Sequence, residues 1–169
     1  MPGAETSSRK TAFDPVVDEH TRLLILGSLP GEASLKARQY YAHPRNGFWR
    51  LIGAVIGRDL VVLPYEDRLA ALGTAGVGLW DVVASAERPG SLDAAIRRPE
   101  AADLRGLVRT LPNLRAVAFN GGTAARLGRA VLADATDAVL IDLPSSSPAH
   151  ARPFEGKAAA WSALTRWVG

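Results

Sequence analysis

Three short segments of the chain combine residue types that could bind a ligand and act on it. The first, Gly27-Ser-Leu-Pro-Gly31, is a turn that follows an apolar run. Its glycines let a ligand approach the backbone closely and leave N–H groups free to donate hydrogen bonds. A plain tight turn between a strand and a helix has the same composition. The turn is not a nucleophile elbow, and the chain contains no Walker A or GxGxxG motif.

The second segment is Gln39-Tyr-Tyr-Ala-His-Pro-Arg-Asn-Gly-Phe-Trp49. Aromatic rings beside cations suit stacking on nucleobases and contact with phosphates. Tyr40, Phe48 and Trp49 could equally be core residues, and we expect Phe48 and Trp49 to be so. For Tyr41, His43 and Asn46, we expect a functional role instead. Positive charge gathers around this segment, because residues 31–58 contain five Lys and Arg residues against Glu32 alone: Lys36, Arg38, Arg45, Arg50 and Arg58.

The third segment, Leu143-Pro-Ser-Ser-Ser-Pro-Ala-His150, is rich in hydroxyl groups. Serine hydroxyls and backbone amides together can hold phosphate oxygens. The plain alternative is a surface connector. A serine hydrolase using Ser145 or Ser147 with His150 and Asp142 is a further alternative, but these residues lie too near one another along one loop for a triad geometry.

Composition narrows the function classes. The chain has 169 residues, of which 47% are hydrophobic and 22% charged, as in a folded globular protein. The absence of cysteine excludes a disulfide framework, a thiol nucleophile and Cys-ligated metals, and the three histidines lack a metal-binding spacing. We therefore expect no metal and no cofactor. With no apolar run long enough to cross a membrane and no signal-peptide segment, we expect a soluble cytoplasmic protein. The net charge of +3 is weak support for a polyanionic partner.

The elements that must position these segments alternate between strands and helices. Short apolar runs predict four strands, over residues 22–27, 76–83, 115–120 and 138–143. Helical patterns cover residues 48–56 with Asn46 as N-cap, 101–110, 122–133 and 155–168, the last with Trp161, Leu164 and Val168 facing inward. This order predicts an α/β fold, a three-layer α/β/α sandwich with a central four-stranded, mainly parallel sheet. Residues 21–169 would form one domain after a flexible segment, 1–20.

In such a sheet, ligands bind outside the carboxyl ends of the strands. The loops that begin at Gly27, Trp80, Asn120 and Leu143 should therefore share one edge. Because the serine loop is expected at the same edge as the first two segments, we interpret it as a functional loop and not as a plain surface connector.

The motifs together resemble the uracil-DNA glycosylase superfamily from about Arg22 to Trp167. The Gly27–Gly31 turn is similar to its first motif and Leu143–Ala149 to its second, and Tyr41–Trp49 is similar to a segment of its mismatch-specific branch. More narrowly, the chain resembles the hypoxanthine-DNA glycosylase branch. That likeness rests on the first turn with Ser34-Leu35, on residues 39–46, and on Gly78-Leu-Trp-Asp-Val82.

The resemblance implies a monofunctional DNA glycosylase of base-excision repair. Such an enzyme flips a deaminated base out of DNA, here preferably hypoxanthine in deoxyinosine, and hydrolyses its N-glycosidic bond to leave an abasic site. Most branches carry Asn or Asp at the position of Leu29 to hold the attacking water, and leucine cannot do this. The resemblance assigns that role to Asn46. With no lysine in the motifs, a Schiff-base lyase step is not expected.

The remaining site residues are assigned by their place in the motifs. Ser28 is the second catalytic candidate, because amides near it could donate to the departing base. Asp81 could accept a hydrogen bond from N1–H of hypoxanthine, although it could also be an exposed strand-end carboxylate or a helix cap. The base-binding candidates are Gly27, Leu29, Tyr41, Asp81 and Asn120. The DNA-binding candidates are Pro30, His43, Arg45, Pro144, Ser145, Ser146, Ser147, His150 and Arg152.

Two other functions remain open on the sequence. The target could be uracil or a mismatched pyrimidine, or the chain could be a non-catalytic binder of DNA lesions, since Leu29 replaces the usual polar residue. In each case the expected partner is damaged duplex or single-stranded DNA. We expect a monomer that works at the nucleoid.

Overall fold

Four parallel strands form the centre of the protein, whose computed structural model describes residues 9–169. The strands are β2 (Leu23–Gly27), β3 (Val77–Asp81), β6 (Ala116–Asn120) and β7 (Val139–Leu143), in the order β3-β2-β6-β7. Their register pairs Gly27 with Asp81 and Asn120 with Leu143, so the four strands end at one edge of the sheet. All four predicted strands are present, with slightly shorter bounds.

Side chains that alternate along β2 divide the core in two. Leu23 and Ile25 are fully buried on one face of the sheet, and Leu24 and Leu26 are fully buried on the other. Because helices cover both faces, the strand is a continuous apolar run and not an alternating one.

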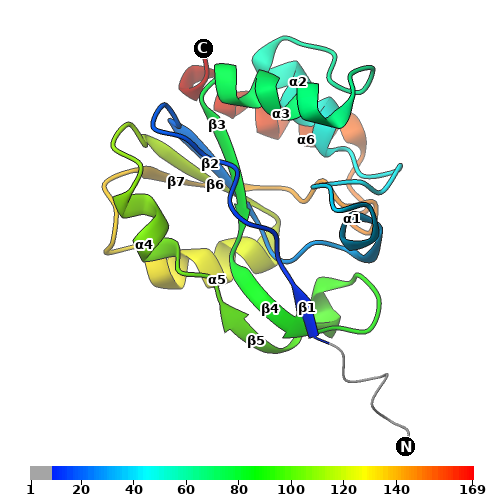
Figure 1. Ribbon diagram of the computed structural model, residues 1–169. Coiled ribbons are helices and arrows are strands. Elements are labelled where there is room, and N and C mark those ends of the chain that lie inside the picture. The colour runs from blue at the N-terminus through cyan, green and yellow to red at the C-terminus, as the bar shows by residue number, and fades with distance from the viewer. Residues whose placement is uncertain (1–8) are drawn as a thin grey trace, which may run out of the picture.

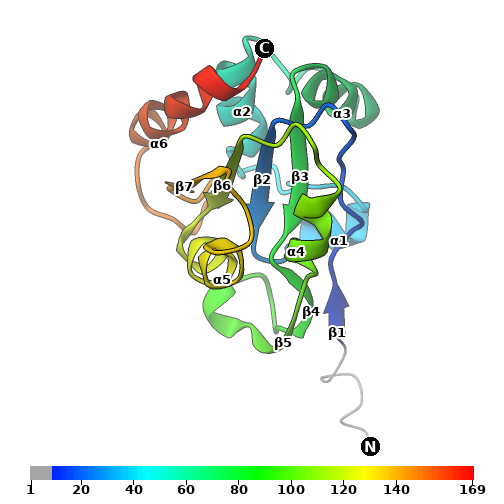
Figure 2. The same cartoon turned by 90° about the vertical axis from the view of Figure 1, so that its left-hand side faces the viewer.

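Helices form a layer on each face of the sheet (Figures 1 and 2). One layer contains α2 (Phe48–Ile56), α3 (Tyr65–Thr74), α6 (Phe154–Trp161) and the 3₁₀ helix η3 (Ser162–Trp167). The other contains α4 (Leu104–Arg109) and α5 (Gly122–Leu132). The predicted three-layer α/β/α sandwich is confirmed. The helix expected over residues 155–168 is instead α6 followed by η3, and Trp161 and Leu164 face the core as predicted.

The connections leave a crevice between β2 and β6. After β2 the chain passes through α1 (Glu32–Ala37), α2 and α3 to reach β3 on one side of β2. It then returns to β6 on the other side and enters α5, in the opposite helical layer. Loops that part toward opposite faces leave room for a ligand outside the carboxyl ends of the strands.

A second, three-stranded antiparallel sheet extends from the end of β3. It contains β1 (Arg9–Thr11), β4 (Val83–Glu87) and β5 (Arg97–Ala101), in the order β1-β4-β5. Only Val82 separates β3 from β4, and its N–H donates to the carbonyl of Gly27 at 2.8 Å. The loop between β4 and β5, which includes the 3₁₀ helix η2 (Asp93–Ala95), therefore lies beside the turn that follows β2. This sheet was not predicted.

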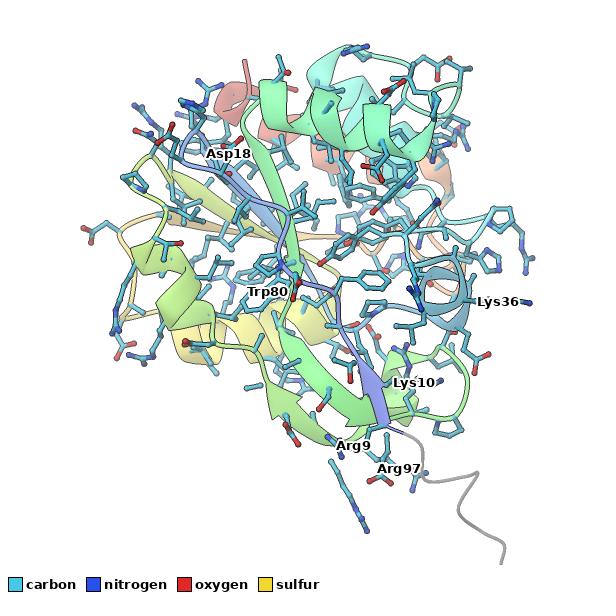
Figure 3. All side chains as sticks on the ribbon, viewed as in Figure 1. Arg9, Lys10, Asp18, Lys36, Trp80 and Arg97 are labelled. Atoms are coloured by element: carbon cyan, nitrogen blue, oxygen red, sulfur yellow. The ribbon has the colours of Figure 1, made fainter. Side chains whose placement is uncertain are left out.

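The N-terminal segment differs from the flexible segment expected over residues 1–20, of which residues 1–8 lie outside the described part. Residues 9–11 form β1, which pairs with β4, and Val16 forms a bridge with Leu79 of β3. The indole of Trp80 donates to the carbonyl of Phe13 at 2.8 Å, and Figure 3 shows Trp80 beside this segment. Strand β1 and the bridge at Val16 therefore lie within the segment that the sequence assigns to a flexible N-terminus. Within residues 9–169, no helix combines the length and apolar character needed to cross a bilayer.

Candidate active site

A cleft of about 920 Å³ lies at the carboxyl edge of the parallel sheet. The three motif segments and Asp81 meet there, which agrees with the prediction that the loops share one edge. The predicted residues that line it are Gly27, Ser28, Leu29, Pro30, Tyr41, His43, Arg45, Asn46, Asp81, Asn120, Ser145, Ser146, Ser147 and His150. Pro144 and Arg152 are not among the lining residues. The Pro144 carbonyl instead accepts a hydrogen bond from the Trp161 indole at 3.0 Å.

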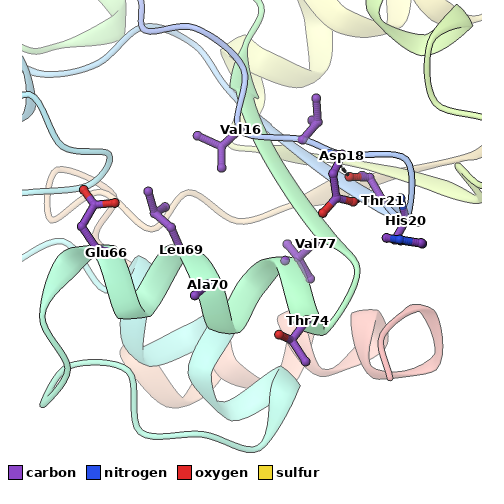
Figure 4. Close-up of a pocket in the computed structure, with 11 residues that line it drawn as sticks. Val16, Asp18, His20, Thr21, Glu66, Leu69, Ala70, Thr74 and Val77 are labelled. Atoms are coloured by element: carbon purple, nitrogen blue, oxygen red, sulfur yellow. Dashed lines mark hydrogen bonds between the residues drawn. The ribbon is translucent and has the colours of Figure 1, made fainter.

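A second hollow, shown in Figure 4, lies near the amino ends of β2 and β3, between the chain around Val16 and helix α3. Its volume is about 550 Å³, and none of the predicted site residues lines it. The two hollows are therefore at different edges of the sheet, and the residues of the sequence motifs line only the first.

Asp81 and Tyr41 form the polar floor of the first cleft. Asp81 is the last residue of β3 and is 3% exposed. Its Oδ2 atom and the Tyr41 hydroxyl oxygen are buried and make no hydrogen bond with any described residue. Burial raises the pKa of Asp81 to about 7, the Arg88 guanidinium opposes the rise, and the Asp93 carboxylate adds to it. A buried carboxyl and a buried hydroxyl without partners are a reason to expect a ligand.

Gly27 keeps this floor open. A Cβ atom at position 27 would lie 2.7 Å from Asp81 Oδ1, closer than real Cβ contacts allow, and 3.1 Å from the Tyr41 hydroxyl oxygen, which is tighter than most of them. Any side chain at Gly27 would therefore displace the two polar groups or fill the space above them.

Tyr41 is held in an uncommon conformation. Its φ is 55°, in the left-handed region, and its ring stacks on Phe48 with centroids 3.9 Å apart and planes 16° apart. Phe48 is fully buried, as predicted for a core residue. Burial, and then the Asp81 carboxyl, raise the pKa of the Tyr41 hydroxyl, so that it stays protonated and can donate a hydrogen bond.

Asn46 lies on a different wall of the cleft, just before α2. Its Oδ1 accepts a hydrogen bond from the Phe48 N–H at 2.9 Å, and its own N–H donates to the His43 carbonyl at 2.9 Å. The predicted N-cap is one residue off, because Gly47 is the N-cap. The hydrogen bond from the Phe48 N–H to Asn46 Oδ1 still fixes the first turn of the helix, and it also orients the Asn46 carboxamide.

Asn120 fixes the serine loop. Its Nδ2 donates to Ser146 Oγ at 2.9 Å and its Oδ1 accepts from the Ser146 N–H at 2.8 Å. The Ser146 carbonyl accepts from the Gly47 N–H at 3.0 Å, and the Ser147 carbonyl accepts from Lys157 Nζ at 3.0 Å. Burial lowers the pKa of Lys157. Asn120 thus lines the cleft and also ties the serine loop to the end of β6.

Arg88 and Asp93 support the first motif, and neither is predicted from the sequence. Asp93 Oδ1 accepts from the Ser28 hydroxyl at 2.5 Å and lies 3.7 Å from the Arg88 guanidinium. Arg88 is 2% exposed and donates to the carbonyls of Leu29 and Pro30. Both residues belong to the antiparallel extension. In the sequence, strand β4 of this extension is indicated only by the short run of small and apolar residues from Val83 to Ala86.

The lips of the cleft carry cations and imidazoles. Arg45 and His150 are exposed, and His43 Nδ1 accepts from the Arg45 N–H at 3.0 Å. Lys36, which projects into solvent from α1 in Figure 3, is not among the residues that line the cleft. Among residues 9–169, no group of three or more His, Asp or Glu side chains could hold a metal ion.

The family model described as "Uracil DNA glycosylase superfamily" matches residues 15–166. The chain belongs to this superfamily. A relative from Methanosarcina barkeri named "Hypoxanthine DNA glycosylase" is 40% identical over 154 residues, covering 91% of this chain and 96% of the relative. A protein of the same name from Methanosarcina acetivorans is 40% identical over 157 residues, covering 93% of this chain and 98% of the relative.

A solved structure supports the same assignment. The solution NMR structure of a candidate uracil DNA glycosylase from Methanosarcina acetivorans matches with a TM-score of 0.84 and 39% identity, covering 94% of this chain and 98% of that one. The resemblance stated from the motifs is therefore confirmed, for the superfamily by the family model and for the hypoxanthine-DNA glycosylase branch by the two relatives of that name. Members of this uracil DNA glycosylase superfamily hydrolyse N-glycosyl bonds in DNA, and the cleft is the place in this chain where such a reaction fits.

Proposed function

We propose that this chain excises deaminated bases from DNA, with hypoxanthine in deoxyinosine as the preferred target, and leaves an abasic site. The observation that carries the proposal is the pair of buried, unpartnered groups on the cleft floor, Asp81 Oδ2 and the Tyr41 hydroxyl, with Asn46 on a neighbouring wall. The names of the two curated relatives support hypoxanthine as the target.

Base recognition takes place on the cleft floor. A base inside a duplex cannot reach a cleft of this size, so the nucleotide must first flip out, at a cost of a few kcal/mol that is smallest for a badly paired base. The Asp81 carboxylate accepts a hydrogen bond from N1–H of hypoxanthine. Adenine has a lone pair at N1, which the carboxylate repels, so the same group rejects the undamaged base. The Tyr41 hydroxyl, which burial keeps protonated and which has no partner among the described residues, donates to the base. One face of the Tyr41 ring is packed against Phe48.

Bond cleavage is mainly electrostatic. As the N-glycosidic bond breaks, positive charge develops on the sugar and the base leaves as an anion. Backbone N–H groups near Ser28 and Leu29 donate to the departing base, and the bond from the Ser28 hydroxyl to Asp93 holds that turn in place. Asn46 is an amide and a poor base, so it orients a water molecule toward C1′ and does not ionise it.

The DNA backbone lies along the lips of the cleft. Arg45, His43 and His150 contact phosphates, and the hydroxyls of Ser145 and Ser147 hold phosphates that flank the lesion. Ser146 is buried, and its N–H and hydroxyl already bond Asn120, so it supports the loop and does not itself contact a phosphate. The contacts from Asn120 and Lys157 keep the serine loop in one conformation before DNA arrives. Arg152 and Pro144 are outside the cleft, and Arg152 remains a candidate for backbone contact further along the DNA. We infer a monomer that acts at the nucleoid in the cytoplasm.

The test is a set of oligonucleotides that each contain one hypoxanthine, uracil, xanthine or thymine mismatch. Alkali-labile sites should form fastest at hypoxanthine, and Asn46→Ala should reduce the single-turnover rate by a factor of about 100, the size of effect that loss of correct positioning causes. Binding of inosine DNA should largely survive in this variant. Unchanged cleavage in Asn46→Ala would remove Asn46 from the mechanism.

Uracil is the second candidate target. Its N3–H group lies between two carbonyls, so it presents Asp81 and Tyr41 with the same donor and acceptor that hypoxanthine presents at N1–H and O6. Faster cleavage at uracil in the oligonucleotide set would favour this target. Binding of lesions without any alkali-labile product would instead favour the non-catalytic binder.

A further inference from the structure

The first two carbonyls of the turn after β2 are directed toward the antiparallel extension. The Gly27 carbonyl accepts a hydrogen bond from the Val82 N–H at 2.8 Å. The Ser28 carbonyl accepts from the N–H of Val83, the first residue of β4, at 3.0 Å. A trans peptide is planar and directs its N–H opposite to its C=O. The N–H groups of the same two peptides, which belong to Ser28 and Leu29, are therefore directed away from the extension.

Arg88 holds the next two carbonyls of the turn. It comes directly after β4, and its side chain has no exposed surface. One terminal nitrogen donates to the Leu29 carbonyl at 3.4 Å, and the other donates to the Pro30 carbonyl. Its Nε donates to the Gly90 carbonyl at 3.2 Å, so each nitrogen of this buried cation has an acceptor. Because the Pro30 carbonyl is held by Arg88, the Gly31 N–H is directed to the opposite side of the turn.

The three N–H groups on that opposite side have no protein partner. The N–H groups of Ser28, Leu29 and Gly31 make no hydrogen bond with another of residues 9–169. The pairing of β2 with β6 stops at Leu26 and Phe119, one residue before the end of each strand, so the Ser28 N–H finds no ladder acceptor. All three residues line the cleft. Backbone N–H groups that are free and gathered in a concavity attract negative charge.

Negative charge develops in the cleft when the N-glycosidic bond breaks and the base keeps the bonding electrons. Donors that already face this charge stabilise the transition state without reorganisation of the site. The carbonyls of the same turn have the opposite effect, because a carbonyl oxygen that turned toward the cleft would repel the departing base. Arg88 holds the Leu29 and Pro30 carbonyls on the far side. A planar guanidinium suits this task, since it donates to two acceptors in a fixed geometry.

We propose that Arg88 is a positioning residue for base excision, which aims the free N–H groups of the turn at the departing base by holding the carbonyls of that turn away from the cleft. The role rests on the proposed function, because it needs a base that leaves in the cleft as an anion. Arg88 is buried and acts on the base only through the backbone of the turn. The antiparallel extension thereby contributes to bond cleavage, in addition to the parallel sheet.

The first test is Arg88→Lys, which keeps the positive charge but replaces the planar fork by one ammonium group. At saturating protein, the single-turnover rate on inosine DNA should fall by about tenfold to hundredfold, somewhat less than the loss of a whole donor of this kind causes. The protein concentration that gives half the maximal rate should change by less than about threefold, because the lost interaction is made mainly in the transition state.

Arg22→Lys is the matched control. Arg22 also donates to two backbone carbonyls, those of Ala75 and Gly169, but it lies just before β2, at the amino ends of the strands. The same substitution there removes a similar set of contacts and should leave the single-turnover rate unchanged.

Amide NMR signals test the donors without a change at Arg88. In isotope-labelled Asn46→Ala, which binds inosine DNA without cleaving it, the signals of the Ser28, Leu29 and Gly31 N–H groups should move downfield when the DNA is added. The double variant that also carries Arg88→Lys should lose most of this movement, because its N–H groups no longer point at the base.

Three results would overturn the role of Arg88 while wild-type cleavage of inosine DNA still supports the proposed function. They are an unchanged rate in Arg88→Lys, an equal loss of rate in Arg22→Lys, and amide signals of the turn that stay in place when DNA binds. A wild-type protein that neither cleaves nor binds lesion DNA would refute the proposed function, and the role of Arg88 with it.

Discussion

Replacing Asp81 with asparagine should change how the stability of the protein depends on pH. The carboxyl is buried, and its pKa is about 7 in the folded protein against an ordinary value of 3.8. Because the folded chain holds the proton more tightly than the unfolded chain, the wild-type free energy of unfolding falls as pH rises from about 4, and it levels off above about 7. Asparagine has the same shape and does not titrate.

The size of the effect follows from the two pKa values. Over the whole range the ionisation of Asp81 costs on the order of 4 kcal/mol, and between pH 5 and pH 8.5 it costs roughly 3 kcal/mol. Asp81→Asn should therefore gain about 3 kcal/mol of stability relative to the wild type as pH is raised across this interval. Arg88 offsets part of the cost and is already included in the pKa.

Urea denaturation of both proteins at several pH values between 5 and 8.5 measures this difference. Asp142→Asn is the control, because Asp142 is exposed and pairs with Arg129 on the surface, so its effect on stability should vary little with pH. A stability difference between Asp81→Asn and the wild type that stays constant with pH would refute the burial argument. The rate of hypoxanthine excision should also rise with pH through about 7 in the wild type and lose this step in Asp81→Asn, because the carboxylate form accepts from N1–H.

Two further variants test the floor and the lips of the cleft. Gly27→Ala should weaken binding of inosine DNA and slow excision by an amount equivalent to roughly 1–3 kcal/mol, since the added Cβ would lie 2.7 Å from Asp81 Oδ1; wild-type single-turnover rates in this variant would mean that the base does not reach the floor. Arg45→Ala should reduce the slope of log affinity against log salt by about 0.9, as expected for the loss of one phosphate contact. Arg109→Ala, on α4, which contributes no lining residue to the cleft, should leave that slope unchanged, and an equal slope in both variants would place the DNA elsewhere.

The central sheet could be predicted from the sequence because its strands are buried on both faces. Leu23–Gly27 and Ala116–Asn120 are entirely buried, so each appears in the sequence as an apolar run ended by a glycine or a polar residue. Once the four strands were recognised, the parallel topology placed the three motifs at one edge. The lining of the cleft by residues as distant as Gly27, Asn46 and Ser145 follows from this.

The antiparallel extension could not be predicted in the same way. Every residue of β5 is exposed, its sequence Arg-Arg-Pro-Glu-Ala has no apolar alternation, and Arg98 has a φ of 50°. Its pairing with β4 is also interrupted by shifts of register. Because Arg88 and Asp93 depend on this sheet for their position, neither could be assigned to the site from local pattern alone.

The position of Leu29 explains why the water-orienting role must lie elsewhere in the cleft. The Leu29 side chain is 6% exposed and belongs to the core cluster that also contains Val82, Val83 and buried residues of α4 and α5. A polar side chain at this position would be buried among apolar groups or would have to turn away from them, with a penalty for the unmet hydrogen bonds. Asn46 reaches the same cleft from the loop before α2, where the Phe48 N–H occupies only one of the lone pairs of Oδ1. The other lone pair and the amide hydrogens remain for water, so an apolar first motif is compatible with hydrolysis when the second loop supplies the amide.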